Sequence, residues 1–248
     1  MPGFLRTYAK PETDLQRPAE AAVVLITGLR RTLIGVLRSV FAQAFEGRVH
    51  LLIGIDGPAG EADLAVLDRL CAAHPDSCVV QVVHPGYATP VLRAVLTCLA
   101  NSRYVAYLDD DNSWHPEHLR LLRAAVGEAD WAYGLRWFVH PRTGRTICVD
   151  GWESVGPGRG IHAERFGGHV DPGCMMIDKL ACALAVSWWT VPPAPGAPDR
   201  SMFAYLREYH RGAGIGRPTV YHRITPAHPL HKLRLELMGS AYAAAGAG

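Results

Sequence analysis

Three consecutive aspartates, Asp109, Asp110 and Asp111, are the strongest chemical signal in the sequence. Adjacent carboxylates repel one another and destabilise a fold unless a cation or hydrogen-bond donors compensate their charge. Their oxygens are the ligands that Mg²⁺ prefers, and they also suit Mn²⁺. The cluster therefore predicts a divalent-cation site, at which a diphosphate would complete the coordination shell. The alternative is an acidic loop that caps the helix expected at Pro116, because Asp and Asn favour such turns.

The aspartates follow a short apolar segment at 104–108 that has the composition of a buried strand. Similar apolar runs precede it, and each is followed by an amphipathic helical pattern. The expected strands are 21–27, 49–55 and 78–83, and the expected helices are 33–41, 61–73 and 91–100. This alternation predicts an α/β fold with a parallel sheet, in which ligands bind at the carboxyl ends of the strands. Thr27 and Asp56 stand at two such ends.

The strand–helix repeat stops after one more expected helix, at 116–128. Residues 131–149 have the pattern of a hairpin, because two strand-like runs flank a Pro-Arg-Thr-Gly turn. The next segment, 150–169, is rich in glycine and has the composition of a long functional loop. Two further helices are expected, at 177–188 and 199–211.

At these residues the chain resembles the family 2 glycosyltransferases of GT-A fold. The fourth strand of that family ends in an Asp-x-Asp motif, followed by a helix with a proline near its start, as at 104–119 here. Residues 23–27 and 37–45 look like the first strand and its helix, and Ile55-Asp-Gly-Pro58 is similar to the family's Asp-Asp-Gly-Ser turn. The resemblance implies a Rossmann-like, mostly parallel sheet with helices on both faces and a smaller C-terminal acceptor region.

The resemblance also implies a division of the chain by function. Residues 1–20 are expected to form an N-terminal arm, and 21–130 the nucleotide-sugar-binding half. Residues 131–225 would form the acceptor-binding and catalytic half. The last segment, 226–248, is expected to be a tail without a functional signal.

Carried over residue by residue, the resemblance implies a donor site. Asp109 and Asp110 would lie against the ribose and diphosphate, and Asp56 would contact the nucleobase. We add Thr27 at the end of the first strand and Arg93, whose guanidinium would neutralise phosphate. For Arg93 the alternative is a solvated helix face.

Two residues are expected to hold the cation, which is Mn²⁺ or Mg²⁺. Asp111 takes the metal-binding position of the family's motif, and His222 corresponds to a histidine that completes the metal site in some members. An imidazole ligand suits Mn²⁺ better than Mg²⁺. The alternative for His222 is a structural or solvated histidine, since the chain has 12.

In the family, a carboxylate at the start of a late helix acts as the general base. The segment from Pro198 looks like the start of that helix, which gives the role to Asp199. The alternative is a first-turn carboxylate that only interacts with the helix dipole. Three further residues are candidates for the acceptor side, namely Trp152, Glu153 and Asp171.

The expected function is therefore an inverting, metal-dependent glycosyltransferase. Its donor would be a nucleotide diphosphate sugar, with a UDP-sugar favoured and a GDP-sugar possible, and its acceptor would be a glycan or a small molecule. One alternative is a sugar-nucleotide-binding module of the same fold without turnover. The other is a nucleotidyltransferase, although the short basic piece after the first strand lacks the Gly-rich loop such enzymes usually carry.

Bulk properties exclude several partners. The chain has 25 basic and 23 acidic residues, so no strong field favours nucleic acid. Its apolar runs are far shorter than the roughly 20 residues of a transmembrane helix, and the first residues contain no apolar signal region. Six cysteines without a Cys-x-x-Cys pair are expected to be reduced. We expect a cytoplasmic protein.

Overall fold

The computed structural model describes residues 5–74, 78–83, 89–191 and 198–247. The strands are β1 (Leu5–Tyr8), β2 (Ala21–Thr27), β3 (Val49–Ile55), β4 (Cys78–Val83), β5 (Tyr104–Asp109), β6 (Asn112–Trp114), β7 (Trp131–Val139), β8 (Thr146–Val149), β9 (Gly156–Pro157), β10 (Gly168–His169), β11 (Met175–Asp178) and β12 (Gly212–Arg223). The α-helices are α1 (Leu33–Phe41), α2 (Glu61–Ala72), α3 (Thr89–Leu99), α4 (His118–Val126), α5 (Ala163–Phe166), α6 (Ala183–Ser187), α7 (Pro198–Tyr209), α8 (His231–Met238) and α9 (Ser240–Gly246). Two 3₁₀ turns are η1 (Pro172–Cys174) and η2 (Trp188–Thr190).

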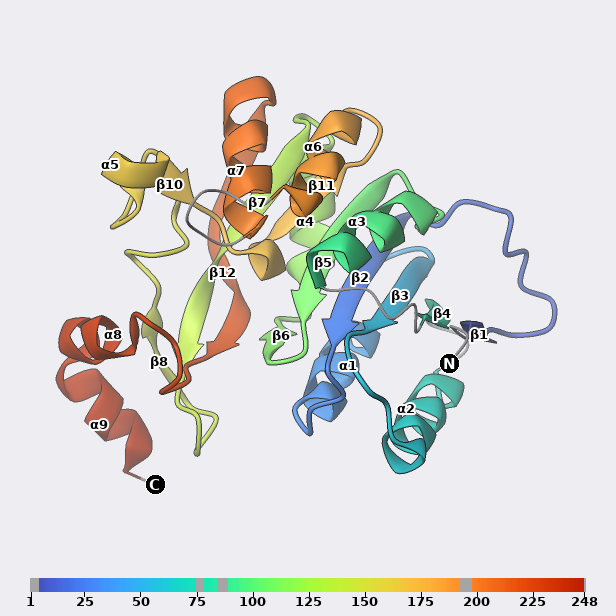
Figure 1. The fold of residues 1–248 in the computed structure, drawn as a ribbon, viewed down its shortest axis with the longest axis horizontal. Coiled ribbons are helices and arrows are strands. Elements are labelled where there is room, and N and C mark those ends of the chain that lie inside the picture. Colours follow the sequence, from blue (N-terminus) through green and yellow to red (C-terminus); the bar gives the residue numbers. More distant parts are fainter. Residues whose placement is uncertain (1–4, 75–77, 84–88, 192–197, 248) are drawn as a thin grey trace.

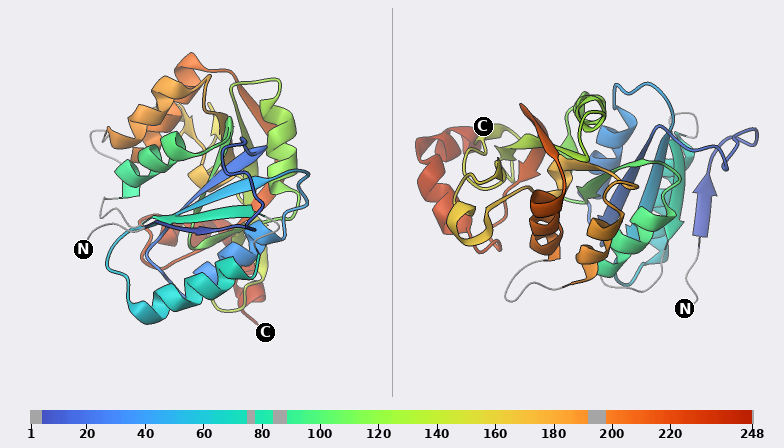
Figure 2. Two further views of the ribbon diagram at one scale, coloured as in Figure 1. Left: turned by 90° about the vertical axis from the view of Figure 1, so that its right-hand side faces the viewer. Right: turned by 90° about the horizontal axis from the view of Figure 1, so that it is seen from above.

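Ten strands of the described chain form one sheet in the order β1-β4-β3-β2-β5-β11-β7-β12-β6, with β8 beside β7 (Figure 1). Strands β4, β3, β2 and β5 are parallel, as the alternating pattern predicts. Figure 2 shows α3, α6 and α7 on one face of the sheet and α1 and α2 on the other. Every residue of β2 and β3 is buried, because helices cover both faces of these strands. The α/β fold expected from the sequence is confirmed.

The second half of the sheet is mixed. Strand β11 runs antiparallel between β5 and β7, and β12 pairs parallel with β7 and antiparallel with β6. The helix expected at 177–188 is therefore wrong in its first part: Met175–Asp178 is a central strand, and the helix is confined to Ala183–Ser187. A short apolar run has the same pattern in a buried strand and in a buried helix, and here pairing on both sides selects the strand. The hairpin expected at 131–149 is confirmed as β7 and β8.

Two outer segments contain more structure than their composition indicates. In the expected arm, β1 adds an antiparallel edge strand beside β4, and Arg6 and Tyr8 both bond to Asp68. In the expected tail, α8 and α9 form a second layer, where Met238 packs with Phe138 in a small separate core. Both segments therefore belong to the folded unit.

The expected functional loop at 150–169 is partly packed structure. Asp150 and Ser154 are completely buried and Glu153 is 3% exposed. Gly151 is exposed, but residues 153–156 are buried, and the longer exposed stretch begins only at Gly158, after the short strand β9 (Gly156–Pro157). The first part of the segment is therefore packed structure.

The helices of the described residues are short. The longest, α2 and α7, have 12 residues each. None in this part of the chain combines the length and apolar character that a bilayer crossing requires. The cytoplasmic location expected from the sequence stays a prediction.

Buried His118 should make the stability of the fold depend on pH. Its ring stacks on Trp114, and its Nδ1 lies 2.8 Å from Thr219 Oγ1. Burial, with a smaller contribution from His115, lowers the pKa of His118 to about 3, so the unfolded chain takes up a proton that the folded protein does not. We expect the free energy of unfolding to fall below about pH 6.5, by about 1.4 kcal/mol per pH unit for this group.

This slope is measured by comparing the free energy of urea unfolding near neutral pH with the value about one pH unit below the ordinary histidine pKa of about 6.5. In His118→Gln the free energy of unfolding should change less steeply with pH, by the contribution of one proton. In His115→Gln the slope should stay nearly as in the wild type. Equal slopes in wild type and His118→Gln would show that this histidine is not the acid-sensitive group.

Candidate active site

The turn after β2 is tied to Asp110 at the end of β5. Thr27 Oγ1 and the Gly28 amide both donate to Asp110 Oδ2, each at 2.9 Å. The Leu29 amide donates to Thr27 Oγ1 at 2.8 Å, and Leu29 adopts a left-handed φ of 58° that non-glycine residues rarely take. Asp110 is 5% exposed. Parallel pairing of β2 with β5 brings these residues together, and Thr27 thereby positions the central aspartate.

A cavity of about 340 Å³ opens at this edge of the sheet. Its size is in the range of small-ligand pockets. Asp56 reaches it from the end of β3, where its amide donates to the Thr27 carbonyl at 2.8 Å. The cavity is lined by Ile26, Gly28, Arg30, Asp56, Asp109, Asp110 and Asp111. The three strand ends thus bring the expected donor-site carboxylates to one cavity.

Arg93 approaches the cavity from α3. Its guanidinium forms an ion pair with Asp109 and lies over the Trp189 ring, with its central carbon 5.1 Å from the ring centre. Burial raises the pKa of Asp109, and the charges of Asp171 and Asp199 add to this shift while Arg93 opposes it. Arg93 is therefore a buried residue that reaches the aspartates, and not part of a solvated helix face.

Asp111 and Arg30 form the open side of the cavity. One guanidinium nitrogen of Arg30 lies 3.5 Å from Asp110 Oδ1 and 3.5 Å from Asp111 Oδ2. Burial and the neighbouring carboxylates Asp109, Asp110 and Asp171 raise the pKa of Asp111 to about 6, against the effect of Arg30. Negative charge is thus in excess at this point, and a cation already stands between two of the carboxylates.

This donor set fits a divalent cation only in part. Asp110 Oδ1 and Asp111 Oδ2 both lie 3.5 Å from the same nitrogen of Arg30, so two hard oxygen ligands of the kind that Mg²⁺ or Mn²⁺ requires share one cation. However, no three His, Cys, Asp or Glu side chains of the described residues converge closely enough to hold an ion alone. An ion bound here would need further oxygens from a diphosphate and from water.

His222 does not present a free lone pair to such an ion. It is paired with Asn112 across β12 and β6, close to Asp111, but Arg136 Nη1 donates to His222 Nδ1 at 3.3 Å. Because Nδ1 accepts, the neutral ring carries its proton on Nε2. Burial and the Arg136 charge lower the pKa of His222 and keep it neutral. Metal binding by His222 would require Arg136 to withdraw, and it stays a prediction.

Asp171 forms the wall of the site next to η1. Its Oδ1 accepts from the Gly173 amide at 2.9 Å, and Arg136 Nη1 donates to its Oδ2 at 2.5 Å. Burial alone would raise the pKa of Asp171, but the charge of Arg136, with smaller effects of His222 and His169, lowers it to about 2. Asp171 is therefore an anion at neutral pH, and its interactions hold it in place.

Behind this wall lies a buried network of charges. Arg136, which is 2% exposed, also donates to Asp150 Oδ2 at 2.8 Å and to Glu153 Oε2 at 2.9 Å. Arg234 of α8, 1% exposed, donates to both Glu153 oxygens at 2.6 Å. Burial raises the pKa of Asp150, but Arg136 and three backbone amides outweigh it and lower the pKa overall. The network joins the hairpin, the segment after it and the C-terminal helices to the site.

Asp199 lies in the first turn of α7, with its side chain 23% exposed. His169 Nε2 is 3.8 Å from Asp199 Oδ2. Burial lowers the pKa of His169, although Asp199 and Asp171 oppose the shift. The charge of Asp199 makes a small contribution to the raised pKa of Asp109, so Asp199 lies in the neighbourhood of the carboxylate site.

Comparison with known proteins rests on structure alone, since no family model and no curated protein sequence matches the chain. The structure of S. aureus TarS residues 1–349 superimposes with a TM-score of 0.59 and 16% sequence identity, covering 82% of this chain and 60% of that one. The complex of TarS 1–349 with UDP-GlcNAc gives 0.60 and 15%, covering 91% and 69%. The chain has the GT-A fold.

This GT-A chain is shorter than the structures it matches. It spans 60% of TarS 1–349 in one structure and 37% of a longer TarS structure, which superimposes with a TM-score of 0.57 and 14% identity. The complex of TarS 1–349 with UDP gives 0.56 and 15%, covering 84% of this chain and 61% of that one. At such low identity the likeness establishes the fold, while the activity has to be argued from the site.

The residues expected to bind the donor lie close together in this fold. The three residues expected on the acceptor side lie in different surroundings. Asp171 borders the carboxylate site, but both oxygens of Glu153 are occupied by buried arginines. Trp152 stacks on Phe138 at 5.3 Å in the small second core. The structure thus gives Glu153 and Trp152 packing contacts, and an acceptor contact for either stays a prediction.

Sequence reasoning missed the arginines that organise the site. Arg136 lies within the apolar strand β7, and Arg234 lies in the segment taken for a tail. A charged residue inside an apolar strand has to be paired when the strand is buried, so Arg136 was a detectable signal. Its partners were not detectable, because Asp150, Glu153 and Asp171 meet it only through the tertiary fold.

Proposed function

We propose that the protein is an inverting glycosyltransferase that moves a sugar from a UDP-sugar to an acceptor hydroxyl. The observation that carries the proposal is the arrangement of the carboxylates: Asp109, Asp110 and Asp111 line a cavity at the strand ends, and Asp199 faces them from α7. The GT-A fold supports sugar transfer, and the UDP and UDP-GlcNAc complexes of TarS support a UDP-sugar as the donor.

In the donor site, cations would surround the diphosphate. Arg30 stands at the mouth of the cavity and Arg93 at its back, where each already neutralises aspartates. Asp110 is held by Thr27 and Gly28 and keeps the cavity in shape, while Asp56, which also lines the cavity, would contact the nucleobase. A divalent ion bound by Asp111 would stabilise the negative charge of the departing diphosphate.

Asp199 would act as the general base. Its carboxylate takes the proton of the acceptor hydroxyl while that oxygen forms a bond to the anomeric carbon of the sugar. The bond from this carbon to the diphosphate oxygen breaks, and its electron pair leaves on UDP. One displacement of this kind inverts the anomeric configuration. His169 Nε2, 3.8 Å from Asp199 Oδ2, would orient the carboxylate if the two groups approach to hydrogen-bond distance.

Release of free nucleotide from a panel of UDP- and GDP-sugars, with Mn²⁺ or Mg²⁺ present, tests the activity. We expect slow release from one or more UDP-sugars without acceptor, and faster release when an acceptor is supplied. Binding of UDP-sugars without any release would support a binding module of the same fold. Cleavage of a nucleotide sugar by pyrophosphate, which yields a nucleoside triphosphate and a sugar 1-phosphate, would support a nucleotidyltransferase instead.

We expect UDP binding to depend on a divalent cation and to lose that dependence in Asp111→Asn. The amide removes a charged oxygen ligand, and it also relieves repulsion within the cluster, so the free energy of unfolding should stay equal or rise. Calorimetry of UDP binding with Mn²⁺ and with a chelator measures the effect. Asp63→Asn, an exposed change on α2, serves as the control. Equal UDP affinity of the wild type under both conditions would refute the metal site.

A further inference from the structure

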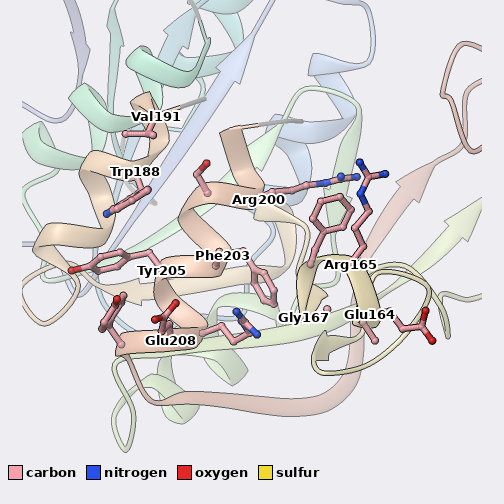
Figure 3. A pocket seen from close by; sticks show the side chains of 16 residues that line it. Glu164, Arg165, Gly167, Trp188, Val191, Arg200, Phe203, Tyr205 and Glu208 are labelled. Atoms are coloured by element: carbon pink, nitrogen blue, oxygen red, sulfur yellow. The ribbon is translucent and has the colours of Figure 1, made fainter. Parts of the chain in front are cut away.

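A second cavity, of about 950 Å³, lies between α5, η2 and α7 (Figure 3). It begins next to the candidate base, since Arg200 and Ser201, which follow Asp199 in the chain, belong to its lining. His169 connects the two places, because it contacts Asp199 and its ring packs edge-on against Phe203 of the cavity floor at 5.9 Å. The cavity is therefore on the acceptor side of the proposed reaction.

Two arginines at one end of this cavity share a single aromatic ring. The guanidinium carbons of Arg165 and Arg200 lie 5.0 Å and 4.1 Å from the centre of the Phe166 ring. In Figure 3 their side chains converge at the same end of the cavity. Neither forms an ion pair with any carboxylate of the described residues. A third guanidinium, that of Arg207, also lines the cavity.

The acidic side chains of the cavity do not neutralise this pair. Glu164 and Glu208 belong to the lining, but Figure 3 places Glu208 at the opposite end and directs Glu164 away from the two guanidinium groups. Two positive charges on one ring, without a carboxylate partner among the described residues, favour the binding of an anion. Guanidinium groups match carboxylate and phosphate oxygens with paired hydrogen bonds.

The opposite end of the cavity is aromatic. Trp188 stacks on Tyr205 with ring centres 5.2 Å apart, and Tyr205 packs against Tyr209 at 4.6 Å. Rings of this kind offer apolar faces, against which the C–H groups of a sugar or polyol can lie. The cavity thus combines a positive end beside the base with an apolar end farther along α7.

We infer that the acceptor is an anionic sugar or polyol, whose phosphate or carboxylate is bound by Arg165 and Arg200. This inference rests on the proposed glycosyl transfer. Arg200 and Asp199 are neighbours in the chain, with Cα atoms about 3.8 Å apart. Because His169 contacts Asp199 and packs against Phe203 of the cavity, an acceptor whose anionic group is bound by Arg200 would reach Asp199 with a hydroxyl by extending past His169. The positive pair fixes the orientation of the acceptor.

Binding is tested with three probes that differ in charge: glucose, glucose 6-phosphate and glucuronic acid. Titration followed by tryptophan fluorescence should report binding, since Trp188 lines the cavity. We expect at least one anionic probe to bind roughly tenfold or more tightly than glucose, and this preference to weaken with added salt. The phosphate and the carboxylate probes separate the two possible anions.

The variants Arg165→Gln and Arg200→Gln should each lower the affinity for the anionic probe by roughly tenfold and leave glucose binding unchanged. Arg159→Gln is the matched control, because Arg159 is an exposed arginine of the same segment outside the cavity lining. Equal binding of all three probes, or equal loss in the control, would overturn the inference.

UDP titration of the same proteins separates this inference from the proposed function. If the wild type binds UDP and releases it from a UDP-sugar but shows no preference for anionic probes or acceptors, only the anionic acceptor is wrong. If the wild type neither binds UDP nor releases it from a UDP-sugar, the glycosyltransferase proposal fails. Anion binding in the cavity would then no longer identify an acceptor site. Normal UDP affinity with loss of the anionic preference in both variants supports both.

Discussion

Asp199→Asn should lower the rate of sugar transfer by about 10²- to 10⁴-fold, the usual effect of removing a general base. The amide keeps the shape of the side chain but cannot accept the acceptor proton at neutral pH. UDP affinity should stay close to wild type, because Asp199 is on α7 and is not one of the residues that line the donor cavity. The transfer rate and the calorimetric affinity for UDP, measured on the same preparation, give the comparison.

The result distinguishes a base from a first-turn carboxylate. Asn is nearly as good as Asp at a helix N-terminus, so a residue with only that role would leave stability and rate unchanged. Full activity of Asp199→Asn would remove the residue from the mechanism, and Asp171 at the wall of the site would become the next candidate. Loss of UDP affinity together with the rate would assign Asp199 to the donor site. Asp63→Asn again controls for the loss of an exposed charge.

Glu153→Gln should lower the free energy of unfolding by about 3 to 5 kcal/mol, because it leaves buried charges uncompensated. Glu153 Oε2 accepts from both Arg136 and Arg234, and Oε1 accepts from Arg234; both arginines are almost completely buried. The amide has the same shape but cannot balance two guanidinium charges. Urea unfolding at neutral pH measures the loss.

The matched control is Glu117→Gln. Glu117 pairs with Arg120 and Arg217, whose side chains are 50% and 59% exposed, so its replacement should lower the free energy of unfolding far less than Glu153→Gln does. Adding Arg234→Met to Glu153→Gln should recover part of the stability, because it removes one of the unpaired charges. A small loss in Glu153→Gln, similar to that of the control, would show that the network contributes little.

Local pattern was enough to find the first half of the fold. Residues 21–27 and 49–55 form strands with the bounds expected, because a strand buried on both faces has a continuous apolar run. The same reasoning failed at Met175–Asp178, a strand whose end was expected to begin a helix, because its four buried residues are followed directly by helix-forming sequence. There the choice depends on β5 and β7, which are distant in the chain.

The candidate site divides in the same way. The carboxylates Asp109 to Asp111 were found because they form one short motif at a strand end, and Arg93 because it lies on the helix before that strand. Arg136 and Arg234 were missed because their partners are separated from them by 14 to 81 residues. The pairing of buried charges is a property of the assembled fold, which spacing along the chain does not encode.

Arg30 gives the donor site a counter-ion of its own. Since the loop after β2 holds this guanidinium 3.5 Å from Asp110 Oδ1 and Asp111 Oδ2, it is always present at high local concentration. A free divalent ion must compete with it, whereas a nucleotide diphosphate offers Arg30 new oxygens and draws it off the carboxylates. The divalent ion and the nucleotide are therefore expected to bind with positive cooperativity, because the diphosphate removes Arg30 from the carboxylates and the ion then balances their negative charge.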